Sequence, residues 1–415
     1  MKLVASLSLI LSLASSVQAN RNTLRCLDPD DVDYTKDYFP DKAVPEFSKL
    51  WNITYHNTYK ILTNYDTDTS YALYQCGTEL PEGVREQHTD AWSVPLQDGI
   101  AASATSQIPQ LEQLGVRRQL KGYLGNPAGI SSPCMKTLAA EGIIQGVNDP
   151  SLGSWQQTAG GTPLADFIVE NPEIVILKSS GTGDKTLNFV AYKEAGNKAT
   201  YEWHKVVGAL FNLEKIANEQ FEESSTRYDC VSDNADYLLA EQAESRARTR
   251  NLADVATKPK VLWAYYYGGC DTYYYEGCLP AYWDVARCDA RNEYYCEFAE
   301  ACSAELLHSN NGTIPVGDYE PDGFHMTTEE FFKFGKDADH WILPSYVSDF
   351  ETEYAQFWDE ISQWKSVANK EVYDIQKSGG GSWFEQRIAE YGACHIMSMS
   401  VRMYVSSMLD LPCIY

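Results

Sequence analysis

Tyrosine oxygens are the most concentrated potential ligand atoms in this 415-residue sequence. Phenolate oxygens are hard donors and bind ferric iron directly. No histidine or carboxylate accompanies the tyrosines at a defined ligand spacing, and the histidines His88, His204, His325, His340 and His395 form no HxH or HxxxH pair. We therefore predict neither a metal site nor an intrinsic cofactor. The tyrosines of the densest run are Tyr265, Tyr266, Tyr267, Tyr273, Tyr274 and Tyr275.

The first three of these tyrosines also fit a structural role. Side chains alternate between the two faces of a strand, so Tyr265 and Tyr267 would share one face and Tyr266 would take the other. One of the two sets would then belong to a hydrophobic core.

Catalytic motifs are absent from the sequence. It contains no GxSxG nucleophile elbow, no P-loop and no HExxH zinc motif. We predict no catalytic residue and no enzymatic activity, with a hydrolase triad hidden by divergence as the remaining alternative.

The first 19 residues have the composition of a cleavable export signal, with Lys2 before an apolar run and small residues before a cut after Ala19. We expect a secreted, extracellular or periplasmic protein without a lipid anchor, because the first cysteine is Cys26. Acidic residues number 58 against 33 basic ones, a formal charge of −25. Such a surface repels phosphate backbones, which excludes nucleic acid as a partner.

The 11 cysteines indicate disulfides, since thiols of exported proteins oxidise. We predict that most of five cysteines in an insert at 270–302 are bonded to one another. The odd total leaves one thiol free or paired with another molecule. Sequons at Asn52 and Asn311 would carry glycans in a eukaryotic secretory pathway. The five insert cysteines are Cys270, Cys278, Cys288, Cys296 and Cys302.

The elements around these residues predict an α/β fold. Alternating residues at 47–76, interrupted by the polar turn NYDTDT, predict a β-hairpin. Short apolar runs then alternate with helical stretches, as in parallel sheets, on both sides of a long helical register with Gly208 as its only glycine. The expected parts are a signal peptide (1–19), an N-terminal extension with the hairpin (20–87), an α/β lobe (88–199), a connecting helical segment (200–258) and a second α/β lobe (259–415).

The order of these segments resembles the class III periplasmic binding proteins. The similarity is carried by 37–43 (DYFPDKA), 70–81, 108–115 (IPQLEQLG), 201–217, 261–269 (VLWAYYYGG), 336–345 and 369–376. The resemblance implies two doubly wound lobes with parallel-type sheets, a rigid helix joining them, and a ligand cleft between the lobes. The insert at 270–302 is longer and richer in cysteine than the family pattern. The chain is thus identified as a secreted, cysteine-rich member of this family, and its sequons are compatible with a eukaryotic source.

Within that fold, loops at the carboxyl ends of parallel strands face the ligand crevice. This rule selects the ligand-binding candidates, and the resemblance implies docking of Asp166 and Glu329 onto a membrane permease. Both acids also suit the first turn of a helix, where the helix dipole favours them. The ligand-binding candidates are Ser103, Thr105, Ser106, Tyr123, Ser180, Tyr265, Tyr267, Gly268, Ser345 and Trp383.

The resemblance implies a monomer that captures a ferric siderophore, a cobalamin-type ligand or a similar iron(III) chelate and delivers it to a permease or another uptake receptor. The negative charge favours neutral or cationic ferric hydroxamates over trianionic catecholates, unless basic residues at Arg117, Arg118 and Lys121 reverse this. The alternative is a secreted interaction protein that has kept the fold without a small ligand.

Overall fold

The computed structural model describes residues 21–153, 157–181, 183–248, 258–269, 281–288, 293–308, 314–316, 320–344, 349–375 and 382–389. The chain divides into two compact units. The first comprises Met1–Glu194 with Lys198–Glu223, and the second comprises Ala195–Asn197 with Ser224–Tyr415. Within the described ranges, no helix has the length and apolar character needed to cross a membrane.

The first unit opens with a four-stranded sheet, which contains the predicted hairpin. β2 (Tyr59–Asn64) and β3 (Thr69–Gln75) pair antiparallel across a turn that Asn64 holds by accepting hydrogen bonds from the backbone of Asp66 and Thr67. The first arm of the hairpin is itself two strands, because β1 (Trp51–Tyr55) folds back antiparallel onto β2. β4 (Asp90–Val94) completes the sheet by pairing parallel with β3.

A six-stranded sheet of parallel strands forms the rest of the first unit, in the order β10-β9-β5-β6-β7-β8. All residues of β5, β9 and β10 are buried, as is usual for parallel strands covered on both faces. This confirms the predicted α/β class. The strands are β5 (Ile100–Ala102), β6 (Leu120–Tyr123), β7 (Gln145–Asn148), β8 (Thr162–Pro163), β9 (Val175–Lys178) and β10 (Thr186–Asn188), and the helices between them are α2 (Ile108–Gln113), α3 (Pro133–Ala140) and α4 (Leu164–Glu170).

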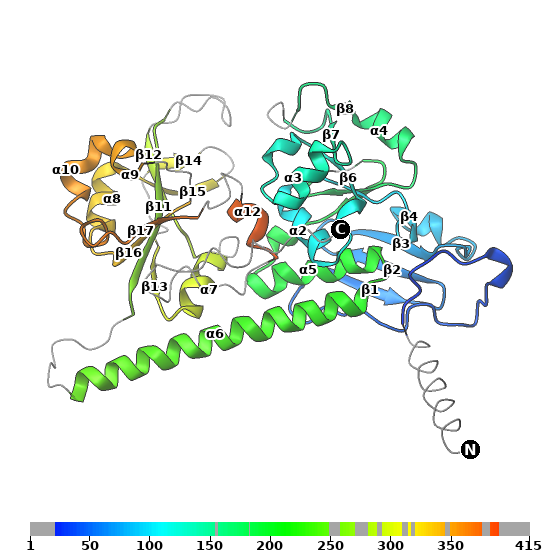
Figure 1. Cartoon of the computed structure of the whole chain (residues 1–415), viewed down its shortest axis with the longest axis horizontal. Coiled ribbons are helices and arrows are strands. Elements are labelled where there is room, and N and C mark those ends of the chain that lie inside the picture. The colour runs from blue at the N-terminus through cyan, green and yellow to red at the C-terminus, as the bar shows by residue number, and fades with distance from the viewer. Residues whose placement is uncertain are drawn as a thin grey trace, which may run out of the picture. The chain divides into compact units, whose positions relative to one another are not determined.

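The predicted long helical segment consists of two helices, α5 (Asn197–Leu210) and α6 (Glu214–Arg248). Asn212 takes a left-handed conformation (φ 56°) between them and breaks the register. Gly208 is needed at this corner, since a Cβ atom there would lie 2.6 Å from the Cβ of Ala217. The long connecting helix is therefore α6, which Figure 1 shows as one unbroken ribbon.

The second unit is built around β11 (Lys260–Tyr267), whose two halves pair differently. Its first half lies parallel to β13 (Glu305–Leu307) and β16 (His340–Leu343), and β17 (Val372–Asp374) extends this part in parallel. Its second half lies antiparallel to β12 (Tyr282–Val285), followed by β15 (Glu320–Met326) and β14 (Ile314–Val316). The sequence pattern predicted the parallel part and not the antiparallel one.

Helices cover both faces of this sheet (Figure 1). One core gathers Trp283, Phe331, Trp341 and Trp364 beneath the helices around α8. The other gathers Val261, Trp263 and Ile342 with residues of α7. The helices are α7 (Glu293–Ala301), α8 (Thr328–Gly335), α9 (Phe350–Glu353), α10 (Trp358–Ile361), α11 (Lys365–Ala368) and α12 (Ser382–Gln386).

Several predicted features lie outside the described residues. They are the signal peptide, Cys270, Tyr273, Tyr274, Tyr275, Cys278, Asn311, Ser345 and His395.

Candidate functional site

The strand order of the first unit reverses at β5. From β5 the chain adds β6, β7 and β8 on one side, whereas β9 and β10 lie on the other. In open α/β sheets, ligands bind at such a switch point, outside the carboxyl ends of the two strands that flank it. Here those ends are followed by Ser103 and Ser179. The Ser103 hydroxyl accepts a hydrogen bond from the backbone N–H of Ser179 (3.1 Å), so the two loops are joined at the switch point.

Gln107, which the sequence analysis did not select, organises this junction. Its Oε1 accepts hydrogen bonds from the backbone N–H groups of Ser103 (2.9 Å) and Ala104 (3.1 Å). Its Nε2 donates to the hydroxyl of Ser179. The side chain is only 1% exposed. Its signal in the sequence was its position, four residues after Ser103 and just before the helix-opening Ile108-Pro109.

A buried ion pair crosses the same edge of the sheet. Lys178 ends β9 and its Nζ lies 2.6 Å from Oδ2 of Asp149, which follows β7, with both side chains 3% exposed. β5 and β6 lie between β7 and β9 in the sheet. The ion pair therefore reaches across the carboxyl ends of β5 and β6. Burial alone would raise the pKa of Asp149, but hydrogen bonds from Lys178 and Ser151 outweigh it and lower the pKa. The two charges cancel, and the edge carries neutral hydrogen-bonding groups.

The other first-unit candidates lie at this edge with more exposure. Thr105 and Ser106 begin the short helix at Thr105–Gln107 and are half-buried, and Ser180 is exposed. Tyr123 is the last residue of β6, and its half-buried ring packs partly against the core.

The basic residues that could attract an anionic ligand lie elsewhere. Arg117 and Arg118 precede β6, and Lys121 is its second residue. They therefore lie towards the amino end of a parallel strand, away from the loops of Ser103 and Ser179.

In the second unit, the structure shows which of the three consecutive tyrosines of β11 faces the core. Tyr266 packs against Trp283 (5.1 Å between ring centroids) and Phe357 (4.7 Å), in the core. Tyr265 and Tyr267 point to the opposite face of the sheet. Tyr267 stacks there on Tyr282, its cross-strand neighbour, with 5.0 Å between ring centroids.

Tyr265 stands at the end of a row of three polar side chains on that face. Asp284 is its direct partner on β12, and His325 is the partner of Asp284 on β15. Burial, and then the nearby negative charge of Asp284, raise the pKa of Tyr265, which also hydrogen-bonds to this carboxylate. The ring of His325 stacks on Tyr282, with 3.7 Å between centroids and 6° between planes. Asp284 was not selected from the sequence and His325 was set aside there as a ligand, because strand pairing rather than sequence spacing brings them to Tyr265.

The remaining candidates of the second unit differ in their surroundings. Gly268 is exposed, and a Cβ atom added there would meet no neighbour within 4 Å. Trp383 is the second residue of α12, and its half-buried ring lies against Trp263 (5.3 Å) and Phe298 (5.7 Å). It packs against the edge of the core that contains Trp263, and a core role was the alternative interpretation of the cleft aromatics.

Asp166 and Glu329 are both exposed in the first turns of α4 and α8. Glu329 pairs with Lys333 (2.7 Å), and this hydrogen bond lowers the pKa of Glu329. Asn52 is half-buried on β1, the outermost strand of its sheet.

Two disulfides join pairs of described cysteines, and Cys134 is also disulfide-bonded. Cys288 and Cys296 are bonded to each other, as predicted for the insert. Cys26 and Cys76 form a second disulfide, which the sequence analysis did not predict. Cys302 is buried at the end of α7 near Tyr228 and Val231, and Cys230 on α6 has an exposed thiol.

No protein-family model matches the sequence, and no curated protein matches it. The fold is similar to that of several solved solute-binding proteins. A heme-binding protein HmuT variant (Y240A) aligns over 94% of this chain and 99% of its own, with 12% identity and a TM-score of 0.41. The siderophore-binding protein BauB, solved with two acinetobactin molecules and ferric iron, aligns over 73% and 90%, with 14% identity and a TM-score of 0.41. A possible iron-binding periplasmic protein from Staphylococcus epidermidis aligns over 72% and 94%, with 12% identity and a TM-score of 0.38.

Proposed function

We propose that this chain is a secreted solute-binding protein, without catalytic activity, that captures a ferric siderophore or a similar iron(III) chelate for uptake. The observation that carries the proposal is the junction of Ser103, Gln107 and Ser179 at the switch point of the parallel sheet, the position where α/β sheets bind ligands. The sequence resemblance to class III binding proteins supplies the ligand class.

The chemistry of the edge narrows the ligand further. Hydroxyl and amide groups dominate it, and the charges of Lys178 and Asp149 are compensated within the pair. The basic residues Arg117, Arg118 and Lys121 lie towards the amino end of β6, away from this edge. A neutral or cationic chelate, such as a ferric hydroxamate, suits these groups better than a trianionic catecholate, which needs opposing cations.

Thermal unfolding with added chelate tests the proposal. A ferric hydroxamate at 100 times its dissociation constant should stabilise the protein by about 2.7 kcal/mol. The iron-free hydroxamate and a ferric catecholate, each titrated at low and high salt, are the comparisons. A catecholate preference that persists at low salt contradicts the charge argument. Stabilisation by no chelate of either class favours a secreted interaction protein without a small ligand.

Delivery to a permease is a separate part of the proposal, and Asp166 and Glu329 are its candidates. Replacing each with alanine should reduce chelate uptake by cells or vesicles that carry the permease, while chelate affinity stays the same. Glu353, another exposed acid in a first turn, provides the matched control. Uptake that is unchanged in the double variant removes the docking role.

A further inference from the structure

The row of Tyr265, Asp284 and His325 holds three different metal-binding groups on neighbouring strands. Tyr265 is directly opposite Asp284, and Asp284 is directly opposite His325. Directly opposite residues of antiparallel strands have Cβ atoms about 4.5–5.5 Å apart. The three side chains therefore project from one face of the sheet, with Asp284 between the other two and hydrogen-bonded to Tyr265.

Two of the donor groups already face each other at a separation suited to a shared ion. Nε2 of His325 lies 3.8 Å from Oδ1 of Asp284. This distance is too long for a hydrogen bond, yet two bonds of about 2.1 Å, the length usual for imidazole and carboxylate ligands of zinc, can span it. Stacking on Tyr282 fixes the plane of the His325 ring, so little ordering would be needed on binding.

The donor set selects the metal. No three His, Cys, Asp or Glu side chains come together as a metal site anywhere in the described part of the chain, so a site at this row must use a phenol oxygen. A phenolate and a carboxylate are hard, anionic donors, which suit a small trivalent cation better than a soft or monovalent one.

We propose that Tyr265, Asp284 and His325 bind a ferric ion directly on the second unit. Binding breaks the O–H bond of Tyr265, forms an iron–oxygen bond and releases the proton to solvent, while iron remains ferric. The inference goes beyond the proposed function, because it requires no siderophore and uses residues of the second unit alone.

Titration of the full chain with ferric nitrilotriacetate tests this site, with iron binding measured by equilibrium dialysis and phenolate ligation by its visible charge-transfer band. The wild type should bind iron and develop the band. Tyr265→Phe, which removes one oxygen atom, should abolish the band and weaken iron binding by more than the roughly 10- to 100-fold cost of losing an outer-shell partner. Asp284→Asn and His325→Gln should weaken binding while each variant keeps its circular dichroism spectrum.

Tyr266→Phe is the matched control, since Tyr266 is adjacent on the same strand and faces the core. It should retain both the band and the affinity. A wild type without the band, or a band that survives in Tyr265→Phe, overturns the inference. The chelate titration separates it from the proposed function. If the protein binds a ferric hydroxamate but Tyr265 does not ligate ferric ion, only this inference is wrong. If Tyr265 ligates ferric ion but the protein binds no hydroxamate, only the proposed function is wrong.

Discussion

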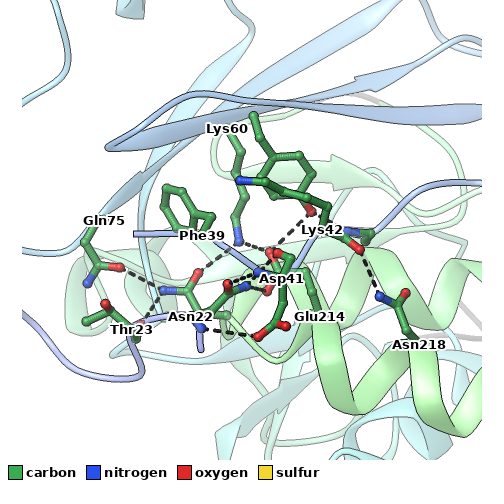
Figure 2. Close-up of polar contacts among 12 residues, drawn as sticks. Asn22, Thr23, Phe39, Asp41, Lys42, Lys60, Gln75, Glu214 and Asn218 are labelled. Atoms are coloured by element: carbon green, nitrogen blue, oxygen red, sulfur yellow. Dashed lines mark hydrogen bonds and ion pairs between the residues drawn. The ribbon is translucent and has the colours of Figure 1, made fainter. Parts of the chain in front are cut away.

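Lys60 on β2 and Glu214, the first residue of α6, form an ion pair in which neither side chain is exposed. Lys60 also donates to Oδ1 of Asn212 (2.9 Å), and Asn22 donates to the other oxygen of Glu214 (2.6 Å). Figure 2 shows the pair at the centre of a network that ties the N-terminal segment to the start of the long helix. Burial lowers the pKa of Lys60, and the charge of Glu214 opposes this shift.

Removing one partner of this pair should destabilise the first unit strongly. Lys60→Met leaves the carboxylate of Glu214 buried without its cation, at an expected cost of about 3–5 kcal/mol in the free energy of unfolding. Lys193→Met is the control, because its pair with Asp66 is partly exposed (41% and 21%) and should contribute at most about 1 kcal/mol. Urea unfolding of both variants measures the difference. Equal losses would mean that burial does not govern the strength of these pairs.

The stability of the protein should fall between pH 6.5 and about 4 because of His204. Burial lowers the pKa of His204 from 6.5 to about 4, and the hydrogen bond with Gln220 opposes this shift. Between pH 6.5 and about 4, His204 is therefore protonated in the unfolded chain but neutral in the folded chain. The resulting loss is about 1.4 kcal/mol per pH unit, and it is absent above pH 6.5. His204→Gln should flatten the slope in that window, as measured by denaturant unfolding at several pH values.

Two of the aromatic candidates should respond oppositely to truncation. Trp383 is half-buried and packs on Trp263 and Phe298, so Trp383→Ala should reduce stability by about 1–3 kcal/mol. Tyr267 lies on the face of the sheet opposite Tyr266, beside exposed Gly268, so Tyr267→Ala should weaken chelate binding by about 1–3 kcal/mol with a smaller effect on stability. Paired calorimetric titration and thermal melts measure both quantities. A stability loss in Tyr267→Ala as large as that in Trp383→Ala would assign Tyr267 to the core.

The disulfide between Cys26 and Cys76 should stabilise the first unit by closing a loop with a sequence separation of 50 residues. Replacing both cysteines with serine should cost about 2–4 kcal/mol. Replacing Cys230, whose thiol is exposed on α6, with serine should cost almost nothing. Denaturant unfolding without reductant compares the two variants, and a double-serine variant as stable as wild type would contradict the expectation.

Local pattern was sufficient to predict elements whose burial is either alternating or continuous along the strand. The alternation around Asn64 predicted the hairpin, and the apolar runs predicted β9 and β16. The break between α5 and α6 was not predicted, because nothing in the local sequence distinguishes Asn212 from a residue inside a helix. The break is explained by a tertiary contact, the close approach of Gly208 to Ala217.

The candidate sites divide in the same way. Strand ends can be read from sequence, so Ser103 and Tyr265 could be selected. Residues that reach these positions through strand pairing or across the sheet edge could not. Asp284 and His325 reach Tyr265 only through antiparallel pairing, and Asp149 reaches Lys178 by crossing two strand ends.

We expect the network in Figure 2 to affect the order in which the chain folds during synthesis, because its partners are far apart in the sequence. Asn22 leaves the ribosome 192 residues before Glu214, its hydrogen-bond partner. Asn212 and Glu214, the hydrogen-bond and ion-pair partners of Lys60, follow it by 152 and 154 residues. Until both are made, docking of the N-terminal segment would bury an uncompensated cation. In a chain that ends before α6, the segment around Asn22 should therefore stay undocked from Lys60, although both strands of the hairpin have already been synthesised.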